Sequence, residues 1–144
     1  MNAKKNAIIE QFISVYANLN TSNVDELDKV YDSSIEFIDP VHRISGLSEV
    51  KQYVRHMYGN ISEYQLIILD NVQGESTAYL TWSLSFCHPK LNGGNKIEFE
   101  GVSKLEFNEK IYKHQDFYDL GAMLYEHIPM FGSLVKIIKT KAGK

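Results

Sequence analysis

The sequence predicts an α+β fold, and a change of pattern along the chain predicts this class. Apolar residues recur at three- and four-residue steps up to residue 59, as on one side of a helix, and at two-residue steps from residue 64, as on one face of a strand. A long antiparallel sheet with one apolar face must be covered, and the early helices are the elements available to cover it. If the sheet curves around these helices, the result is a cone with an internal pocket.

The first two helices are expected within residues 7–31. Apolar side chains share one helical stripe that ends near residues 18–21. Asn23 suits the N-cap of a short second helix ending near Tyr31, because its side chain can accept a hydrogen bond from the free amides of the first turn. The stripe of the first helix consists of Ala7, Ile8, Phe12, Val15, Tyr16 and Leu19.

A short strand and a third helix follow. The strand covers residues 35–38 and must stop at Pro40, since proline has no N–H to donate to a neighbouring strand. Asp39 is therefore held at a strand end. After Gly46 the apolar residues return to helical spacing, which predicts a helix up to Gly59.

Four long strands complete the predicted sheet. The first covers residues 64–72, and the second, residues 78–88, has the clearest alternation of apolar and polar side chains. The sequence Asn92-Gly93-Gly94 supplies the positive φ angles of a hairpin, and Gly101 in the third strand marks a bulge or bend. The last strand covers residues 111–119.

Two short helices are expected after the sheet, separated near Pro129. The second belongs to a basic amphipathic tail, residues 128–144, in which apolar residues alternate with lysines and no acid is present. Such a stripe usually packs over its own domain or a second copy, with the lysines in water. Contact with an anionic membrane is the less favoured interpretation.

Composition limits the classes of function. A chain of 144 residues with 44% hydrophobic and 23% charged side chains can build one globular domain, residues 1–144. A net charge of -3 gives no basic footprint for a phosphate backbone, so no nucleic-acid partner is expected. Cys87 is the only cysteine and cannot form an intramolecular disulfide. The sequence also shows no signal-peptide pattern and no apolar run long enough to span a membrane. Together with the single cysteine, these features predict a cytoplasmic protein.

Four segments of the chain together carry a family resemblance. They are the first helix with Tyr16, the segment from Asn23 to Tyr31, Phe37-Ile38-Asp39-Pro40 with Gly46 six residues on, and Asp119-Leu120-Gly121-Ala122-Met123-Leu124. In this order they resemble the NTF2-like superfamily and, within it, the SnoaL-like and ketosteroid-isomerase-like proteins. The resemblance implies a cone with a curved, mixed, mainly antiparallel sheet wrapped around N-terminal helices. It also implies a homodimer packed through the sheet, and an apolar cavity that members use for isomerisation, cyclisation, epoxide hydrolysis or binding alone.

The segment Phe37-Ile38-Asp39-Pro40 resembles the one that bears the general base of ketosteroid isomerase. Asp39 is therefore a candidate base, since a carboxylate beside an apolar cavity gains affinity for a proton. The alternative is that Asp39 only caps the loop before the third helix. Tyr16 is the candidate phenol donor. Ser103 stands where the resemblance places a protonated aspartate, which argues against a true ketosteroid isomerase.

His114, Asp116 and Tyr118 lie at two-residue steps on the last predicted strand and share one face. If this face lines the cavity, a His/Asp pair about 6 to 7 Å apart along the strand can share a proton directly or through water. The alternative turns the other face inward, with Ile111, Phe117 and Asp119. Asp119 is the rival acid, because its segment resembles the end of the last strand in SnoaL-like cyclases, where an acid has a catalytic role.

We therefore expect a cofactor-free isomerase or cyclase that acts by acid/base chemistry on a small hydrophobic carbonyl compound. Its catalytic candidates are Tyr16, Asp39, His114 and Asp116. The alternative is a non-catalytic module that binds a lipid-like ligand or an accessory protein. No metal is expected, because no tight pair of metal-ligating residues occurs. The side chains expected to contact a ligand are His42, Tyr53, Met57, Trp82, Phe86, Tyr118 and Asp119.

Overall fold

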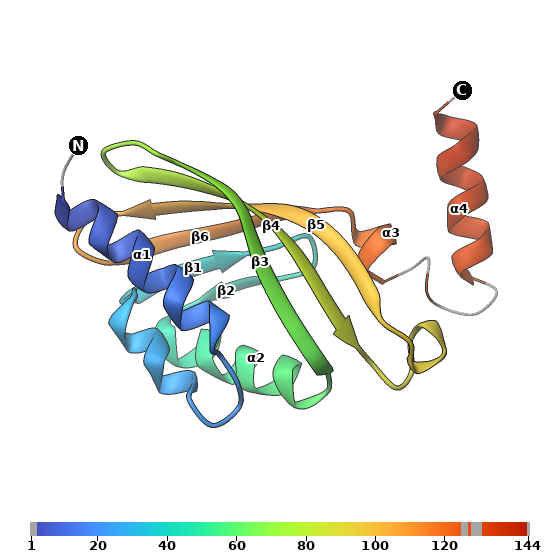
Figure 1. The fold of residues 1–144 in the computed structure, drawn as a ribbon, viewed down its shortest axis with the longest axis horizontal. Coiled ribbons are helices and arrows are strands. Elements are labelled where there is room, and N and C mark those ends of the chain that lie inside the picture. Colours follow the sequence, from blue (N-terminus) through green and yellow to red (C-terminus); the bar gives the residue numbers. More distant parts are fainter. Residues whose placement is uncertain (1–2, 125–126, 128–130, 144) are drawn as a thin grey trace.

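The computed structural model describes residues 3–124, 127 and 131–143, and within them a six-stranded sheet with helices before and after it (Figure 1). The two short helices labelled η are 3-10 helices. The elements are α1 (Ala3–Ala17), η1 (Val24–Lys29), β1 (Tyr31–Ile38), β2 (Arg43–Ser45), α2 (Leu47–Gly59), β3 (Ser62–Gln73), β4 (Thr77–Cys87), η2 (Asn92–Gly94), β5 (Ile97–Phe107), β6 (Ile111–Tyr118), α3 (Leu120–Met123) and α4 (Phe131–Ala142).

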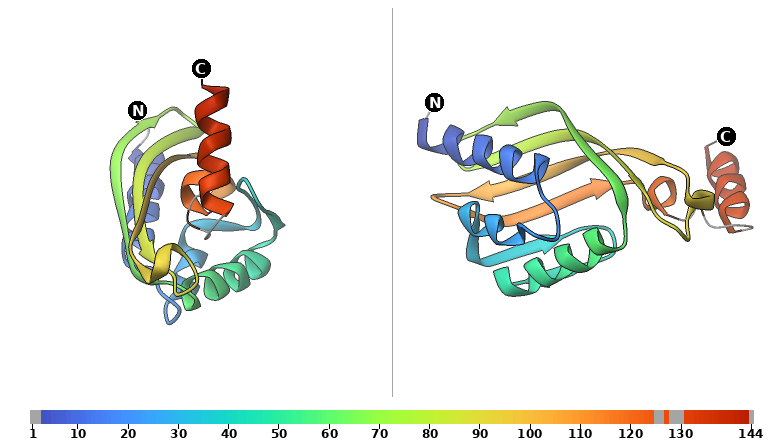
Figure 2. Two further views of the ribbon diagram at one scale, coloured as in Figure 1. Left: turned by 90° about the vertical axis from the view of Figure 1, so that its right-hand side faces the viewer. Right: turned by 60° about the horizontal axis from the view of Figure 1, so that its bottom comes forward.

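The sheet is mixed and curved, with the strand order β2-β1-β6-β5-β4-β3. β1 pairs with β6 in parallel, and every other neighbouring pair is antiparallel. Figures 1 and 2 show the sheet bending around α1 and α2, which lie on its concave side. The predicted α+β class, with a curved mixed sheet wrapped around N-terminal helices, is confirmed.

The core forms where the apolar stripe of α1 meets the concave face. Ile8, Phe12 and Val15 are buried, as their helical spacing predicts, and they belong to one cluster with Leu80 and Leu105 of the strands. Each such side chain contributes about 1.5–3 kcal/mol by leaving water. This packing fixes α1 against the sheet and so fixes the position of Tyr16, which lies on the same helix.

Two predictions for the early part of the chain need correction. The second helix is a 3-10 helix, and Asn23 stands at its N-cap position without the expected side-chain hydrogen bond to the helix. Its Oδ1 accepts from the Asn20 amide at 2.7 Å and its Nδ2 donates to the Asn18 carbonyl at 2.7 Å, which closes the preceding turn instead. The first strand begins at Tyr31 rather than at Ile35. The short strand β2 was not predicted, because three residues are too few to show an alternating pattern.

Of the bulge or bend expected at Gly101, the bulge is absent. β4 and β5 pair in continuous register through Trp82 and Gly101. A Cβ on residue 101 would lie only 2.5 Å from Cη2 of Trp82. Glycine is therefore needed here because the Trp82 ring lies directly on the strand.

The C-terminal helix α4 stands away from the sheet, beyond α3 (Figure 2). Its apolar residues Leu134, Ile137 and Ile138 are each more than half exposed, so they do not pack over their own domain, and packing against a second copy stays a prediction. Pro129, predicted to separate the two C-terminal helices, and Lys144 of the tail lie outside the described residues. Across the part of the chain that the structure describes, no helix is long and apolar enough to cross a membrane.

Candidate functional site

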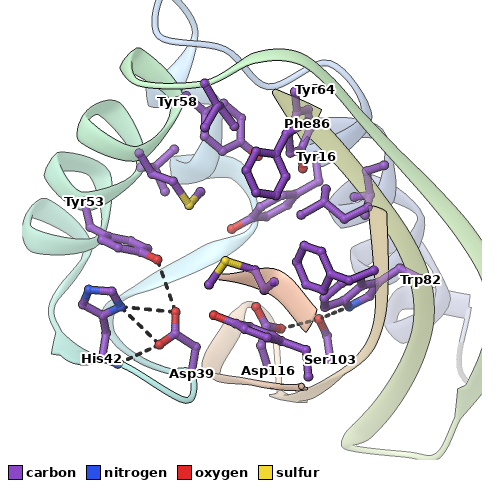
Figure 3. A pocket seen from close by; sticks show the side chains of 18 of the residues that line it. Tyr16, Asp39, His42, Tyr53, Tyr58, Tyr64, Trp82, Phe86, Ser103 and Asp116 are labelled. Atoms are coloured by element: carbon purple, nitrogen blue, oxygen red, sulfur yellow. Dashed lines mark hydrogen bonds and ion pairs between the residues drawn. The ribbon is translucent and has the colours of Figure 1, made fainter. Parts of the chain in front are cut away.

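A cavity of about 570 Å³ lies between the concave face of the sheet and the helices α1 and α2 (Figure 3). Small-molecule sites typically occupy about 300–1,000 Å³. Of the candidate residues, only Asp119 is not part of the lining. The candidates that line the cavity are Tyr16, Asp39, His42, Tyr53, Met57, Trp82, Phe86, His114, Asp116 and Tyr118.

The last strand, β6, presents His114, Asp116 and Tyr118 to the cavity. Phe117, on the opposite face, is 50% exposed, so the alternative orientation is wrong for this half of the strand. Ile111 is nevertheless fully buried, because the ladder with β5 is irregular at the beginning of β6 and changes which residues point inward.

Four side chains form a continuous chain of short hydrogen bonds behind and along the cavity wall. The Tyr16 and Tyr31 hydroxyls lie 2.6 Å apart, and the Tyr31 hydroxyl lies 2.6 Å from Nδ1 of His114. Nε2 of His114 lies 2.6 Å from Oδ1 of Asp116. Both ring nitrogens of His114 are therefore engaged, and its side chain is only 3% exposed.

The Asp116 carboxylate is held by one oxygen only. Oδ1 accepts a 2.5 Å hydrogen bond from the Ser103 hydroxyl in addition to its contact with His114. The Ser103 hydroxyl in turn accepts from Nε1 of Trp82 at 2.9 Å. Among the described residues, no hydrogen bond reaches Oδ2 of Asp116, which lies in the cavity wall (Figure 3). Asp116 thus has a fixed orientation and an oxygen available to a ligand.

The Asp39 carboxylate is held much more completely. Oδ1 accepts from the backbone amides of Val41 at 2.8 Å and His42 at 2.6 Å, and Oδ2 accepts from the Tyr53 hydroxyl at 3.2 Å. The His42 ring lies 3.2 Å from Oδ1 (Figure 3). With a side chain only 3% exposed, Asp39 closes its own loop while it lines the cavity, as the alternative interpretation expected.

The phenols around the cavity stay protonated at neutral pH. Burial raises the pKa of Tyr16 and Tyr31 well above the usual value for tyrosine. Burial and the nearby Asp39 carboxylate likewise raise the pKa of Tyr53 and Tyr118. At Tyr64, burial raises the pKa to about 12. The cavity is therefore lined by neutral hydroxyl groups that can donate hydrogen bonds.

The other walls of the cavity are apolar and aromatic. The Trp82 and Phe99 rings are edge to face, with centroids 5.6 Å apart, and Phe99 stands in the same way 5.2 Å from Tyr118. Phe86 extends this aromatic wall. Such a wall can hold the flat faces of a hydrophobic ligand beside Asp116.

Asp119 lies outside the cavity lining, contrary to its expected contact with a ligand. It caps α3, where its Oδ1 accepts from the Gly121 amide at 2.8 Å and the Ala122 amide at 3.3 Å. The bond from Lys139 of α4 lowers the pKa of the Asp119 carboxyl. Its exposed side chain is therefore part of the link between α3 and α4.

Sequence reasoning missed Tyr31, which connects Tyr16 to His114. Tyr31 has the same parity as Ile35 and Phe37 in β1, so extending the predicted strand backwards would have placed it on the inward face. In the described residues, no group of three or more histidine, cysteine, aspartate or glutamate side chains is arranged to hold a metal ion.

A comparison with protein families decides the family of this chain. The family model of the SnoaL-like domain matches residues 11–114. The chain belongs to the SnoaL-like family. The match extends from α1 to His114 and includes Tyr16 and Asp39. A comparison with curated proteins found no match.

Solved structures share the fold of this SnoaL-like protein at low sequence identity. TsrD from Streptomyces laurentii is 16% identical, with a TM-score of 0.69 over 85% of this chain and 93% of its own. A hypothetical protein with a ketosteroid isomerase-like fold from Catenulispora acidiphila, in complex with trimethylamine, is 12% identical, with a TM-score of 0.72 over 85% and 93%. A protein from Jannaschia sp. CCS1, proposed to be a SnoaL-like polyketide cyclase, is 8% identical, with a TM-score of 0.74 over 85% and 92%.

Proposed function

We propose that this protein is a cofactor-free acid/base enzyme that acts on a small hydrophobic carbonyl compound, as an isomerase or a cyclase. The observation that carries the proposal is the Asp116 carboxylate, which is held by His114 and Ser103 through Oδ1 and has Oδ2 open in an apolar cavity. A base in this position is oriented by the protein and is only 17% exposed to solvent.

In the proposed reaction, Oδ2 of Asp116 takes a proton from the carbon next to the carbonyl. The C–H bond breaks, and its electron pair moves through the carbon–carbon bond to the carbonyl oxygen. Tyr16 turns its O–H from Tyr31 to that oxygen and donates a hydrogen bond to it, which stabilises the negative charge that develops there. The result is an enolate held by Tyr16, with Asp116 protonated.

The enolate can then react in two ways that restore the groups. Asp116 returns its proton to a different carbon of the ligand, which is an isomerisation. In a cyclisation, the enolate carbon instead attacks a second carbonyl of the same ligand, and the new alkoxide takes the proton from Asp116. In both cases the first carbonyl forms again and the Tyr16 hydroxyl turns back to Tyr31. The resemblance of this family to cyclases and ketosteroid isomerases agrees with this type of chemistry.

The experiment follows proton exchange and does not require the natural substrate. The probe is 2-tetralone in D₂O, and NMR measures the loss of the protons next to its carbonyl. We expect the wild-type protein to accelerate exchange and Asp116→Asn to lose about 100-fold or more of that acceleration, which is the typical contribution of a general base. Asp70→Asn, a change of an exposed aspartate outside the cavity lining, is the matched control and should exchange at the wild-type rate. Equal rates for the wild type and Asp116→Asn would refute the proposal.

The second candidate function is binding of a lipid-like ligand or an accessory partner without turnover. Asp39 favours it, because the carboxylate that the family resemblance assigns as the base is occupied by the amides of its own loop. The two candidates differ in one measurement. If the protein only binds, 2-tetralone would quench the fluorescence of Trp82, and the protons of 2-tetralone would exchange at the rate measured in buffer.

A further inference from the structure

We infer that the cavity selects its ligand by charge: it accepts uncharged or cationic apolar molecules and excludes anionic ones. The inference rests on the proposed function, because it names the class of ligand for the same cavity. The observation behind it is the set of charged side chains in the lining.

The lining contains two acids, Asp39 and Asp116, and it contains no lysine or arginine among the described residues. The cations of the neighbouring helix α2 point elsewhere. Lys51 and Arg55 form ion pairs with Asp25 on the outer side of the molecule, whereas Tyr53 and Met57 of the same helix face the cavity. The fold therefore places carboxylates inside and their possible counter-ions outside.

This arrangement penalises an anionic ligand twice. Its charge loses hydration on entering an apolar cavity, and no lysine or arginine replaces that hydration. It also meets the Asp39 and Asp116 carboxylates across a low-dielectric space, where like charges repel more strongly than in water. An uncharged carbonyl oxygen carries neither penalty and can accept from the phenols. A cation gains from Asp116 and from the faces of Trp82 and Tyr118.

The influence of these carboxylates extends across the cavity. After burial, Asp39 is the next cause that raises the pKa of Tyr53 and of Tyr118, which stand on different elements. Asp116 also contributes at Tyr64, on a third element. A negative charge on a ligand would be opposed in the same way as a negative charge on these phenols.

Imidazole is the one basic group that lines the cavity in the described part of the chain, as His42, His56, His88 and His114. The test is therefore made at pH 8, where the low proton concentration disfavours the charged form of any imidazole. Three probes share one shape and differ in charge: 1-adamantanemethanol, 1-adamantylmethylamine and 1-adamantanecarboxylate. They do not absorb where tryptophan does, and Trp82, the only tryptophan of the protein, lies in the cavity wall and reports binding by fluorescence.

We expect the alcohol and the amine to bind and the carboxylate to bind at least tenfold more weakly than the alcohol. Asp116→Asn should reduce this difference by about threefold or more, because one of the two repelling charges is gone, and Asp70→Asn should leave it unchanged. Melting temperatures show that each variant is folded. A carboxylate that binds within twofold of the alcohol, or a failure of all three probes to bind, would overturn the inference. Charge selection without exchange of 2-tetralone would overturn only the proposed reaction.

Discussion

Asp39 and Asp116 line the same cavity but are held in opposite ways. Asp39 follows the last residue of β1, and two backbone amides of its own loop donate to it. Asp116 lies in the middle of β6, and its partners Ser103 and His114 are side chains of β5 and β6. The first carboxylate completes a local turn, whereas the second is fixed by tertiary structure and has one oxygen to offer.

The difference teaches that position in a family motif does not determine which acid can react. A carboxylate whose oxygens are filled by loop amides and a neighbouring hydroxyl stabilises its loop and has little left for a ligand. A carboxylate held on one side by a hydrogen-bond chain keeps its orientation and one free oxygen. Three substitutions test this difference between Asp39 and Asp116.

The largest effect is expected for Tyr31→Phe, which interrupts the chain of hydrogen bonds that leads from Tyr16 to Asp116. It removes the partner of Nδ1 of His114, and a buried polar atom without a partner costs about 1–3 kcal/mol. The exchange of 2-tetralone should also fall by up to about tenfold, because a single hydrogen bond contributes about 0.5–1.5 kcal/mol and about 1.4 kcal/mol corresponds to a tenfold change in rate. Tyr112→Phe, at a partly exposed tyrosine of β6, is the control for both measurements. Equal rates in the two variants would mean that the chain plays no part in the reaction.

A stability loss of similar size is expected for Gly101→Ala, which disturbs the support of Ser103. The new Cβ would lie 2.5 Å from Cη2 of Trp82, so the ring must move away from the strand. Overpacking of this kind costs about 1–3 kcal/mol, and each kcal/mol lowers the melting temperature by about 2–4 °C in a domain of this size. Gly74→Ala is the control, because its nearest neighbour, the Thr77 carbonyl oxygen, is 3.4 Å away. Calorimetry that finds the same melting temperature for both variants would contradict the close contact.

The smallest effect is expected for Asp39→Ala, which removes the acceptor of two loop amides. We expect a loss of about 1 kcal/mol in the free energy of unfolding, measured with urea, and little change in the exchange of 2-tetralone. Asp39→Asn should recover most of the stability, because an amide oxygen can accept the same bonds. If Asp39→Ala instead loses exchange as fully as Asp116→Asn, the two carboxylates act together and the contrast between them is wrong.

The periodicity of the sequence predicted much of the fold because long elements repeat their pattern often. The helical stripe of α1 and the alternation in β4 gave the correct faces. The alternation in β6 placed His114 and Asp116 on one face but did not decide whether that face points inward. The short strand β2 and the first residues of β1 could not be predicted in this way. Tyr31 is the first residue of β1, and it was therefore missed as a site residue.

The role of Asp119 could not be predicted for a different reason. Asp116 and Asp119 lie on opposite faces if the strand continues through both, and a change in where the strand ends reverses the conclusion. In the structure β6 stops at Tyr118, and Asp119 becomes the cap of α3. A local motif contains no information about which of these two geometries the neighbouring elements allow.

The parallel pairing of β1 with β6 also has a consequence for how the protein is made. It sets Phe37 beside His114, so the first strand synthesised waits for the last one before it gains its central neighbour. Contacts between such distant parts of a chain form slowly. When only about the first hundred residues have left the ribosome, β6 is missing and the edge of β1 that pairs with it is open. We expect this incomplete chain to be prone to aggregation, because unpaired strand edges favour pairing with other chains.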